Sequence, residues 1–254
     1  MPMTPIPSAT ILLLRDGADG PEIFMLRRRE DLGFAGGALV FPGGKLASGD
    51  ADAALLMDGA DALAPDLRPL AAAAIREAFE ESGILLARRA GRLLSGGEAA
   101  SLDGFRAPLD REDIMLSDFL RGNDLRLAAD LLVPFAHWIT PAFVPRRFDT
   151  YFFAANAPAG QLAAHDGGEA VESLWIAPKV ALAKFARADL MMPTRLNLEL
   201  LVHCRTSDEA LAQARARKIV PVEPWVEERG GRKMIVIPKD AGYGEIAVPF
   251  DSER

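Results

Sequence analysis

The segment "LAAAAIREAFEES", residues 70–82, constrains the fold of this chain more than any other. Its apolar residues recur at the spacing of one side of an α-helix, and its charged residues fall on another side. Pro69 precedes the segment and Gly83 follows it, which suits the first turn and the C-terminal end of a helix. The sequence therefore predicts a helix over residues 70–82 that packs its apolar side against a core.

Three glutamates share one face of this predicted helix. Glu77 lies three residues before Glu80 and four before Glu81, and residues at these spacings are neighbours on a helix surface. Like charges placed in this way oppose helix formation by about 0.2–0.5 kcal/mol per pair, and Arg76 offsets only part of that repulsion. A divalent cation such as Mg²⁺, which prefers oxygen ligands, would resolve it. A solvated acidic surface is the alternative interpretation.

The remaining segments predict strands on both sides of the helix in chain order. The apolar runs at residues 9–14 and 22–26 are expected to form a hairpin, and a short strand at 38–41 runs into Pro42. Later segments are strands at 131–141, 148–155 and 172–178, helices at 178–185, 194–205 and 208–217, and a closing hairpin between 220–226 and 233–238. This order favours the α/β (α+β) class, with a mixed sheet between helices.

Residues 84–129 are predicted to form a helical annex to this arrangement. The run "LDREDIMLSDFL", residues 109–120, is amphipathic, and Asp110 is a candidate N-cap for a helix there. C-terminal helices and a hairpin enlarge the chain further at about residues 178–240. The sequence shows no clear linker, so a single domain over residues 1–254 is expected.

Composition excludes several classes of function. The 254 residues carry a formal net charge of -7, whereas a general nucleic-acid-binding protein needs a basic surface. No apolar run approaches the length of a membrane span, and the N-terminal residues lack the pattern of a secretory signal. Cys204 is the only cysteine, which excludes an intrachain disulfide. These features favour a cytoplasmic location. The acidic charge does not exclude an anionic small substrate, because a bound divalent cation can invert the local field.

Two motifs near the predicted helix carry a family resemblance. "FPGGK" occupies residues 41–45, and "REAFEESGI" occupies residues 76–84. The second motif resembles REUxEExGU, the second half of the Nudix signature, in which U is an aliphatic residue. The resemblance implies a Nudix-type α/β/α sandwich with a mixed sheet. It also implies hydrolysis of a diphosphate linkage with Mg²⁺ or Mn²⁺ as the cofactor.

The spacing inside the signature departs from the plain pattern. The first acid of the signature falls at Asp50, and 25 residues lie between Asp50 and Arg76 where the signature has seven. Residues 51–68 are therefore an insert, expected to interrupt a loop and to leave the helix intact. A long insert at this place, together with "GALVFPGGK" and "RRFDTYFF", resembles the coenzyme A diphosphatase branch of the superfamily. That branch implies coenzyme A or acyl-coenzyme A as the substrate, giving 3′,5′-ADP and (acyl-)4′-phosphopantetheine.

The resemblance assigns roles to individual residues of the helix and the glycine loop. Glu77 and Glu81 are implied as the main metal ligands, and Glu80 as a ligand or the catalytic base. Arg76 is implied to orient these glutamates. The backbone carbonyl of Gly44 is implied as a further ligand of the metal.

Two further parts of the implied site lie in loops. Some members of the superfamily use a later acid as the catalytic base, for which Glu169 is the candidate and Glu172 its neighbour. A solvated loop residue is the alternative for Glu169. Gly43 is a candidate for substrate binding, because a glycine lets a loop approach phosphate groups closely.

Basic and aromatic residues are candidates for contacts with the substrate. Arg27, Arg29 and Arg147 suit phosphate groups, and Trp138 suits an adenine ring or, as the alternative, the core. Alternation along a strand would place Arg27 and Arg29 on one face and Arg28 on the other. At least one arginine in each cluster is expected to be an ordinary surface or ion-paired residue.

Two other functions stay open at this point. One is a Nudix hydrolase that acts on ADP-ribose, a dinucleotide or a nucleotide sugar, because the arginine spacing upstream of the glycine loop is loose. The other is a catalytically silent Nudix module that binds a nucleotide, although a pure binder need not keep three mutually repelling acids. A homodimer is compatible with the resemblance, and neither nucleic acid nor a membrane is an expected partner.

Overall fold

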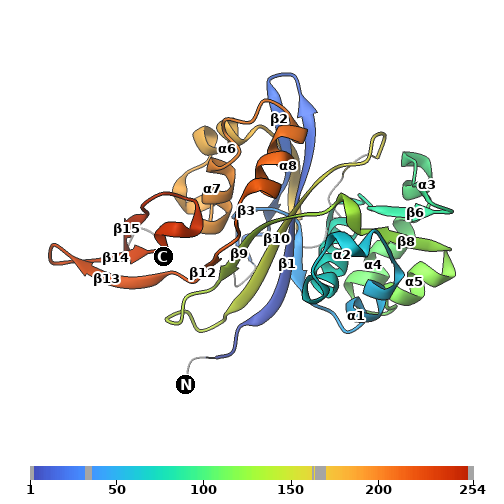
Figure 1. Ribbon diagram of the computed structural model, residues 1–254, viewed down its shortest axis with the longest axis horizontal. Helices are drawn as coiled ribbons and strands as arrows, with labels where there is room; N and C mark the ends of the chain where they lie inside the picture. The colour runs from blue at the N-terminus through green and yellow to red at the C-terminus, as the bar shows by residue number, and fades with distance from the viewer. Residues whose placement is uncertain (1–2, 32–35, 162, 164–169, 251–254) are drawn as a thin grey trace.

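A central sheet divides the molecule into two halves in the computed structural model, which describes residues 3–31, 36–161, 163 and 170–250. The strands of this sheet are β1 (Ile6–Gly17), β2 (Gly20–Arg28), β3 (Leu39–Val40), β4 (Gly43–Lys45), β9 (Val133–Ile139), β10 (Phe148–Asn156), β11 (Ala170–Ile176) and β12 (Pro221–Val222). Their order is β11-β2-β1-β10-β9-β12, with β3 beside β2 and β4 beside β1. Helices flank both sides of this mixed sheet (Figure 1), which confirms the predicted α/β (α+β) class.

β1 is the strand that positions the others. It pairs in parallel with β10 along nine residue pairs that begin at Ile6. Its C-terminal part forms the predicted hairpin with β2. Nearer its N-terminus, β4 pairs with it in antiparallel fashion, and Thr10 lies opposite Gly43. Backbone pairing to β1 therefore fixes the glycine loop in place.

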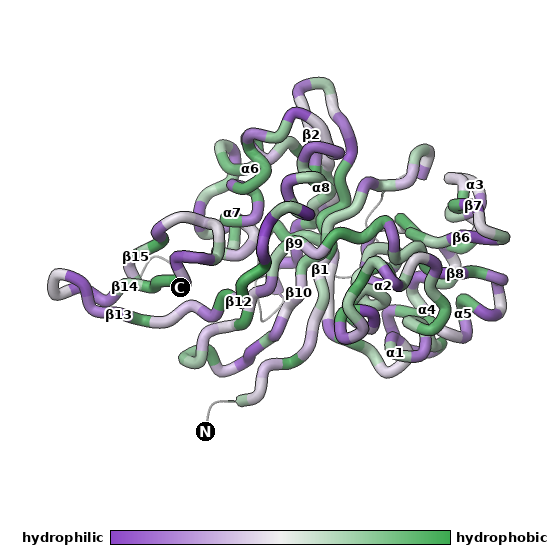
Figure 2. Tube along the Cα trace, viewed as in Figure 1, coloured by the Kyte–Doolittle hydropathy of each residue, from purple (hydrophilic) through white to green (hydrophobic). Residues whose placement is uncertain are grey.

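Two hydrophobic cores lie on opposite faces of the sheet. Successive side chains of a strand point to opposite faces, so Ile11 and Leu13 join one core while Leu12 and Leu14 join the other. The first core packs under the predicted catalytic helix, and the second under the C-terminal helices. Figure 2 shows hydrophobic residues along the strands and the helices that cover them, and hydrophilic residues toward the turn between β13 and β14.

The predicted helix is α2 (Arg68–Ser82). It begins two residues before the predicted start because Pro69 occupies its first turn. It ends at Gly83, whose φ of 76° is left-handed and whose amide donates to the carbonyl of Phe79. The alanines and Phe79 are buried in the first core. Unusually for charged residues, Arg76, Glu77 and Glu80 are buried as well, so the solvated-surface alternative does not hold for this face.

The insert folds against the helix instead of forming an open loop. It comprises α1 (Asp50–Ala53), η1 (Ala54–Leu56), β5 (Met57–Asp58), η2 (Ala60–Ala62) and η3 (Pro65–Leu67). All of these elements precede α2 and leave it uninterrupted. β5 pairs with a strand of the annex, β8 (Leu125–Ala128), so that Met57 lies opposite Leu127.

The annex is less helical than predicted. It contains α3 (Gly96–Ala100), η4 (Asp103–Phe105), α4 (Arg106–Asp110), α5 (Leu116–Gly122) and η5 (Ala129–Leu131), together with β6 (Ala87–Arg89), β7 (Arg92–Leu93) and β8. These three strands and β5 form a small sheet that was not predicted from the sequence. The prediction of Asp110 as an N-cap was wrong. Asp110 ends α4, and the left-handed φ of 54° at Glu112 separates α4 from α5.

The C-terminal region covers the other face of the sheet. Its helices are α6 (Pro178–Lys184), η6 (Arg187–Asp189), α7 (Met192–Glu199), α8 (Ser207–Ala216) and η7 (Lys239–Ala241). The closing hairpin lies between β13 (Trp225–Arg229) and β14 (Arg232–Val236), and β15 (Ala247–Pro249) adds a third strand. The first residues of the predicted hairpin instead form β12 beside β9. Among the described residues, no helix is long and apolar enough to span a membrane.

Candidate active site

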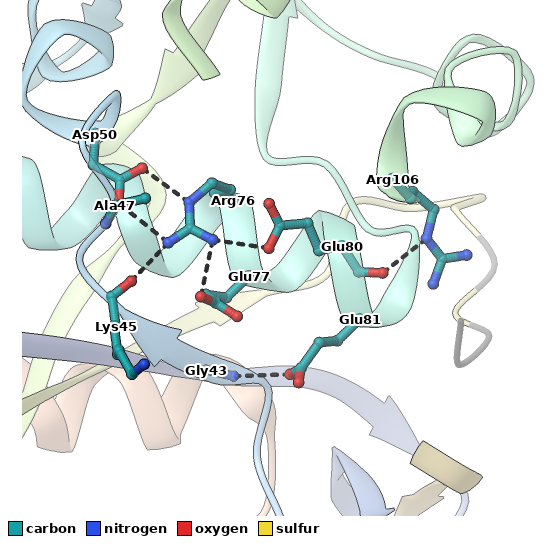
Figure 3. Close-up of polar contacts among 9 residues, drawn as sticks. All are labelled: Gly43, Lys45, Ala47, Asp50, Arg76, Glu77, Glu80, Glu81 and Arg106. Carbon is teal, nitrogen blue, oxygen red and sulfur yellow. Dashed lines mark hydrogen bonds and ion pairs between the residues drawn. The ribbon is translucent and has the colours of Figure 1, made fainter. Parts of the chain in front are cut away.

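Arg76 is the centre of a buried network of charges (Figure 3). Its Nε and Nη2 donate to the two carboxylate oxygens of Asp50 at 3.0 and 3.1 Å. Its Nη1 donates to Glu77 Oε1 at 2.9 Å and to Glu80 Oε2 at 2.8 Å. Nη2 also donates to the carbonyl of Lys45 at 2.8 Å. One guanidinium therefore joins the start of α1, the glycine loop and two glutamates of α2.

Asp50, the first acid of the signature, anchors this network from the side of the insert. Its side chain is fully buried beside Arg76, and its Oδ2 also accepts a hydrogen bond from the amide of Ala47 at 2.7 Å. Asp50 is not among the residues that line the adjacent cleft. The shorter acid thus binds the arginine instead of facing a ligand.

The glycine loop lies directly against the glutamate face of α2. The amide of Gly43 donates to Glu81 Oε2 at 2.9 Å. A Cβ atom at Gly43 would lie only 2.6 Å from the carbonyl oxygen of Ala9 on β1, and one at Gly44 would collide with the carboxylate of Glu77. Both positions therefore require glycine for lack of space.

Burial shapes the acidity of this cluster. Burial raises the pKa of Glu77 to about 7 and that of Glu80 to about 8, and the attraction of Arg76 opposes both shifts. The negative charge of Asp110, at the end of α4, raises the pKa of both glutamates further. Burial alone would lower the pKa of Arg76, but the charges of its acidic partners outweigh burial and raise it.

The chemistry of these side chains suits a hard divalent cation. Arg76 donates a hydrogen bond to one carboxylate oxygen of Glu80, Oε2. The other oxygen of Glu80, Oε1, is buried without a hydrogen-bond partner. A cation would satisfy such an oxygen. The described residues nevertheless contain no group of three His, Cys, Asp or Glu side chains that is already gathered to hold an ion. They supply a partial ligand set of the kind that Mg²⁺ completes with water and substrate phosphates.

A cleft of about 780 Å³ opens from the glutamates and crosses the sheet. Its wall passes from Gly43 on β4 to Thr10 on β1, then to Thr150 on β10 and Trp138 on β9. Three strand-to-strand steps correspond to roughly 14 Å. The cleft therefore has room for a diphosphate at the glutamates and for a bulkier group farther along.

The character of the wall changes along this path. Glu77, Glu80 and Glu81 line it beside the glycine loop, and two acids of the annex, Asp110 and Glu112, line it as well. The remaining wall is largely apolar or aromatic and includes Trp138, Phe148, Phe152, Met191, Met192 and Ile235. Arg28 and Arg146 provide positive charge in the cleft lining.

Only some of the predicted substrate-binding residues line this cleft. Gly43 and Trp138 do, and the indole nitrogen of Trp138 donates to Tyr243 at 3.1 Å. Trp138 is thus both a core residue and part of the wall. Arg27 does not line the cleft. It donates to the carbonyl of Gly37 at 3.0 Å and contacts Glu172 at 3.3 Å.

Arg29 and Arg147 are also placed away from the cleft lining. Arg29 forms an exposed ion pair with Asp31 at 2.6 Å. Arg147 is buried, donates to the carbonyl of Thr140 at 2.9 Å and pairs with Glu223 at 2.5 Å. Their neighbours Arg28 and Arg146 line the cleft instead.

Of the two candidates for the later catalytic base, only Glu172 lies within the described residues. Glu169 belongs to residues 164–169, which the structure does not describe. Glu172 lies on β11, where it contacts Arg27 and does not line the cleft. Conversely, Asp110 and Glu112 were not predicted as site residues, because acids at or just beyond the end of a short helix resemble ordinary surface residues in the sequence.

Comparisons with known proteins agree with this geometry. A family profile described as the NUDT19 Nudix domain matches residues 57–200. "Putative nudix hydrolase 7" of Caenorhabditis elegans is 27% identical over 226 residues, which cover 87% of this chain and 69% of that protein. The crystal structure of a Nudix hydrolase from Alicyclobacillus acidocaldarius superposes with a TM-score of 0.68 at 28% identity, covering 83% of this chain and 96% of that one.

Proposed function

Since the chain belongs to the NUDT19 Nudix domain family and is a Nudix hydrolase, we propose that it cleaves the diphosphate linkage of a nucleoside diphosphate derivative with Mg²⁺ or Mn²⁺. The observation that carries the proposal is the shared face of Glu77, Glu80 and Glu81, which Arg76 and the glycine loop hold at the cleft. Glu77 and Glu80 are buried there. We further propose that residues 1–254 act as one catalytic domain.

The residues of the cluster have different roles in this reaction. Arg76 fixes Glu77 and Glu80 relative to each other, and the Gly43 amide fixes Glu81. When bound, a divalent cation supplies positive charge that stabilises the phosphoryl oxygens and acidifies water. A carboxylate of the cluster accepts the proton of the attacking water. The water oxygen bonds to one phosphorus as the bridging phosphorus–oxygen bond of the anhydride breaks, and each product keeps one phosphate group of the former linkage.

The remainder of the cleft supports coenzyme A or acyl-coenzyme A as the substrate. Trp138 and Phe148 offer aromatic surface for an adenine ring. Met192 and Ile235 offer apolar surface for a pantetheine arm or an acyl chain. Arg146 suits the phosphate charges of this substrate. The products would be 3′,5′-ADP and (acyl-)4′-phosphopantetheine.

Product identification by mass spectrometry tests this proposal. The wild-type protein with Mg²⁺ or Mn²⁺ would be given coenzyme A, acetyl-coenzyme A, ADP-ribose, a nucleotide sugar, NADH and diadenosine polyphosphates. We expect 3′,5′-ADP to appear first, and the Glu81→Gln variant to lose the activity. Glu228→Gln is the matched control, because Glu228 lies on β13 and does not line the cleft.

The other outcomes distinguish the alternatives. If ADP-ribose, a nucleotide sugar or a dinucleotide is consumed instead, the reaction class holds and the coenzyme A proposal fails. If wild-type protein binds these compounds but cuts none of them, the silent nucleotide-binding module is the correct interpretation. Homodimerisation and a cytoplasmic location stay predictions, which light scattering and cell fractionation would check.

A further inference from the structure

The short helix α4 brings residues of the annex to the catalytic helix. Its first residue, Arg106, donates from Nε to the backbone carbonyl of Glu80 at 3.0 Å (Figure 3). Asp110 lies four residues later, and residues at this spacing share one side of a helix. Asp110 also lines the same cleft as Glu77 and Glu80. The annex therefore presents a carboxylate to the glutamate face from outside the signature.

Glu80 provides a second and independent observation. Only 3% of its side chain is exposed, and Arg76 occupies its Oε2. Its Oε1 is buried and has no hydrogen-bond partner, although buried polar atoms are normally satisfied. The donors of Arg76 are directed to Glu80 Oε2, Glu77, Asp50 and Lys45. An unsatisfied carboxylate oxygen of this kind points to a cation as its missing partner.

We propose that Asp110 is a ligand of a divalent cation held between α4 and α2, together with Glu80 and Glu77. This proposal takes only the use of a divalent cation from the proposed function. Asp110 is exposed and lines the cleft, so a hydrated ion can approach its carboxylate. The carboxylates of Glu77 and Glu80 are held by Arg76 before the ion arrives. The annex thus adds the Asp110 carboxylate to the two ligands that α2 supplies.

Binding of Mn²⁺ alone, followed by the electron paramagnetic resonance signal of the free ion, tests this inference without any substrate. We expect Asp110→Asn to weaken Mn²⁺ binding by about tenfold or more, or to remove one bound ion per chain. Asp113→Asn is the matched control. Asp113 lies in the following turn, pairs with exposed Arg111 at 2.8 Å and does not line the cleft, so this variant should bind Mn²⁺ like the wild type.

A second variant guards against an effect on folding. Asp110→Glu keeps the carboxylate and should retain most of the binding, while Asp110→Asn loses it, and circular dichroism melting would compare their folds. Mn²⁺ binding by Asp110→Asn with wild-type affinity and stoichiometry would overturn the inference. Loss of binding in Asp110→Asn without turnover of any substrate by the wild type would support the inference and contradict the proposed function.

Discussion

Gly44 and the carboxylate of Glu77 approach each other so closely that no side chain fits between them. A Cβ atom built on Gly44 collides with Oε1 of Glu77 and would lie 2.7 Å from its Cδ. The contact joins β4 to α2, which are separated in sequence by the whole insert. Close approach of the glycine loop is therefore part of how the glutamate face is positioned.

We expect Gly44→Ala to lower kcat about a hundredfold. The added methyl group must displace Glu77, and displacement by about 1 Å has an effect of this order in active sites. Overpacking of this kind also destabilises folded proteins by about 1–3 kcal/mol. Steady-state kinetics and urea unfolding would measure the two effects.

Gly97→Ala is the control for this substitution. Gly97 lies in α3, and a Cβ atom there meets nothing within 4 Å, so both kcat and stability should match the wild type. Wild-type activity in Gly44→Ala would show that the close contact has no role in positioning Glu77.

Replacement of Arg76 by methionine should destabilise the fold strongly. Asp50 would keep a buried charge without its partner, and breaking a buried ion pair in this way costs about 3–5 kcal/mol. Arg92→Met removes an exposed pair with Glu98 and should cost below about 1 kcal/mol. Urea denaturation of both variants measures the difference, and equal values would contradict the structural role assigned to Arg76.

The stability of the cation-free protein should fall as pH rises. Burial raises the pKa of Glu77 from 4.5 to about 7 and that of Glu80 to about 8. Between about pH 5 and pH 8 the folded chain thus binds more protons than the unfolded chain, so the free energy of unfolding decreases with pH. Thermal melts in a chelator across this range would record a falling Tm.

Mg²⁺ should reverse this trend. Carboxylate ligands bind a cation in their deprotonated form, so the rise in Tm on adding Mg²⁺ should be larger at pH 8 than at pH 5.5. A double variant, Glu77→Gln with Glu80→Gln, should show a flatter pH profile and a smaller Mg²⁺ effect. A Tm that does not change with pH in the chelator would contradict the burial of these two acids.

We expect Arg146 to contribute to substrate binding. It is exposed, lines the cleft and lies 5.3 Å from the ring of Phe148. Loss of a charged contact to phosphate in Arg146→Ala should raise KM about tenfold and change kcat little. Arg29→Ala is the control, since Arg29 pairs with Asp31 away from the cleft lining. Equal KM values for the two variants would remove Arg146 from the site.

Local signals were enough to predict α2 and the strands around it. Pro69 and Gly83 mark the ends of the helix, and apolar runs of adequate length mark β1, β2, β9 and β10. The small sheet was missed because its strands have only two to four residues. Strands so short carry no recognisable alternation, and their pairing depends on contacts distant in sequence.

In the candidate site, too, local sequence predicted some features and the tertiary fold determined others. Spacing alone placed three glutamates on one face, and Arg76 donates hydrogen bonds to two of them. Alternation separated Arg28 from Arg27 and Arg29, but only the tertiary fold decides which face meets the cleft. The position of Asp110 at the cleft depends on the packing of α4 against α2, which no local sequence pattern predicts.

The pairing of β5 with β8 has a consequence for the history of this chain. The insert contributes one strand of the small sheet and the annex contributes the other three. A chain that lost either segment would leave the other with an unpaired strand edge and exposed apolar surface. The two segments, which flank α2 in the chain, therefore depend on each other for strand pairing, and we expect homologues to carry both or neither.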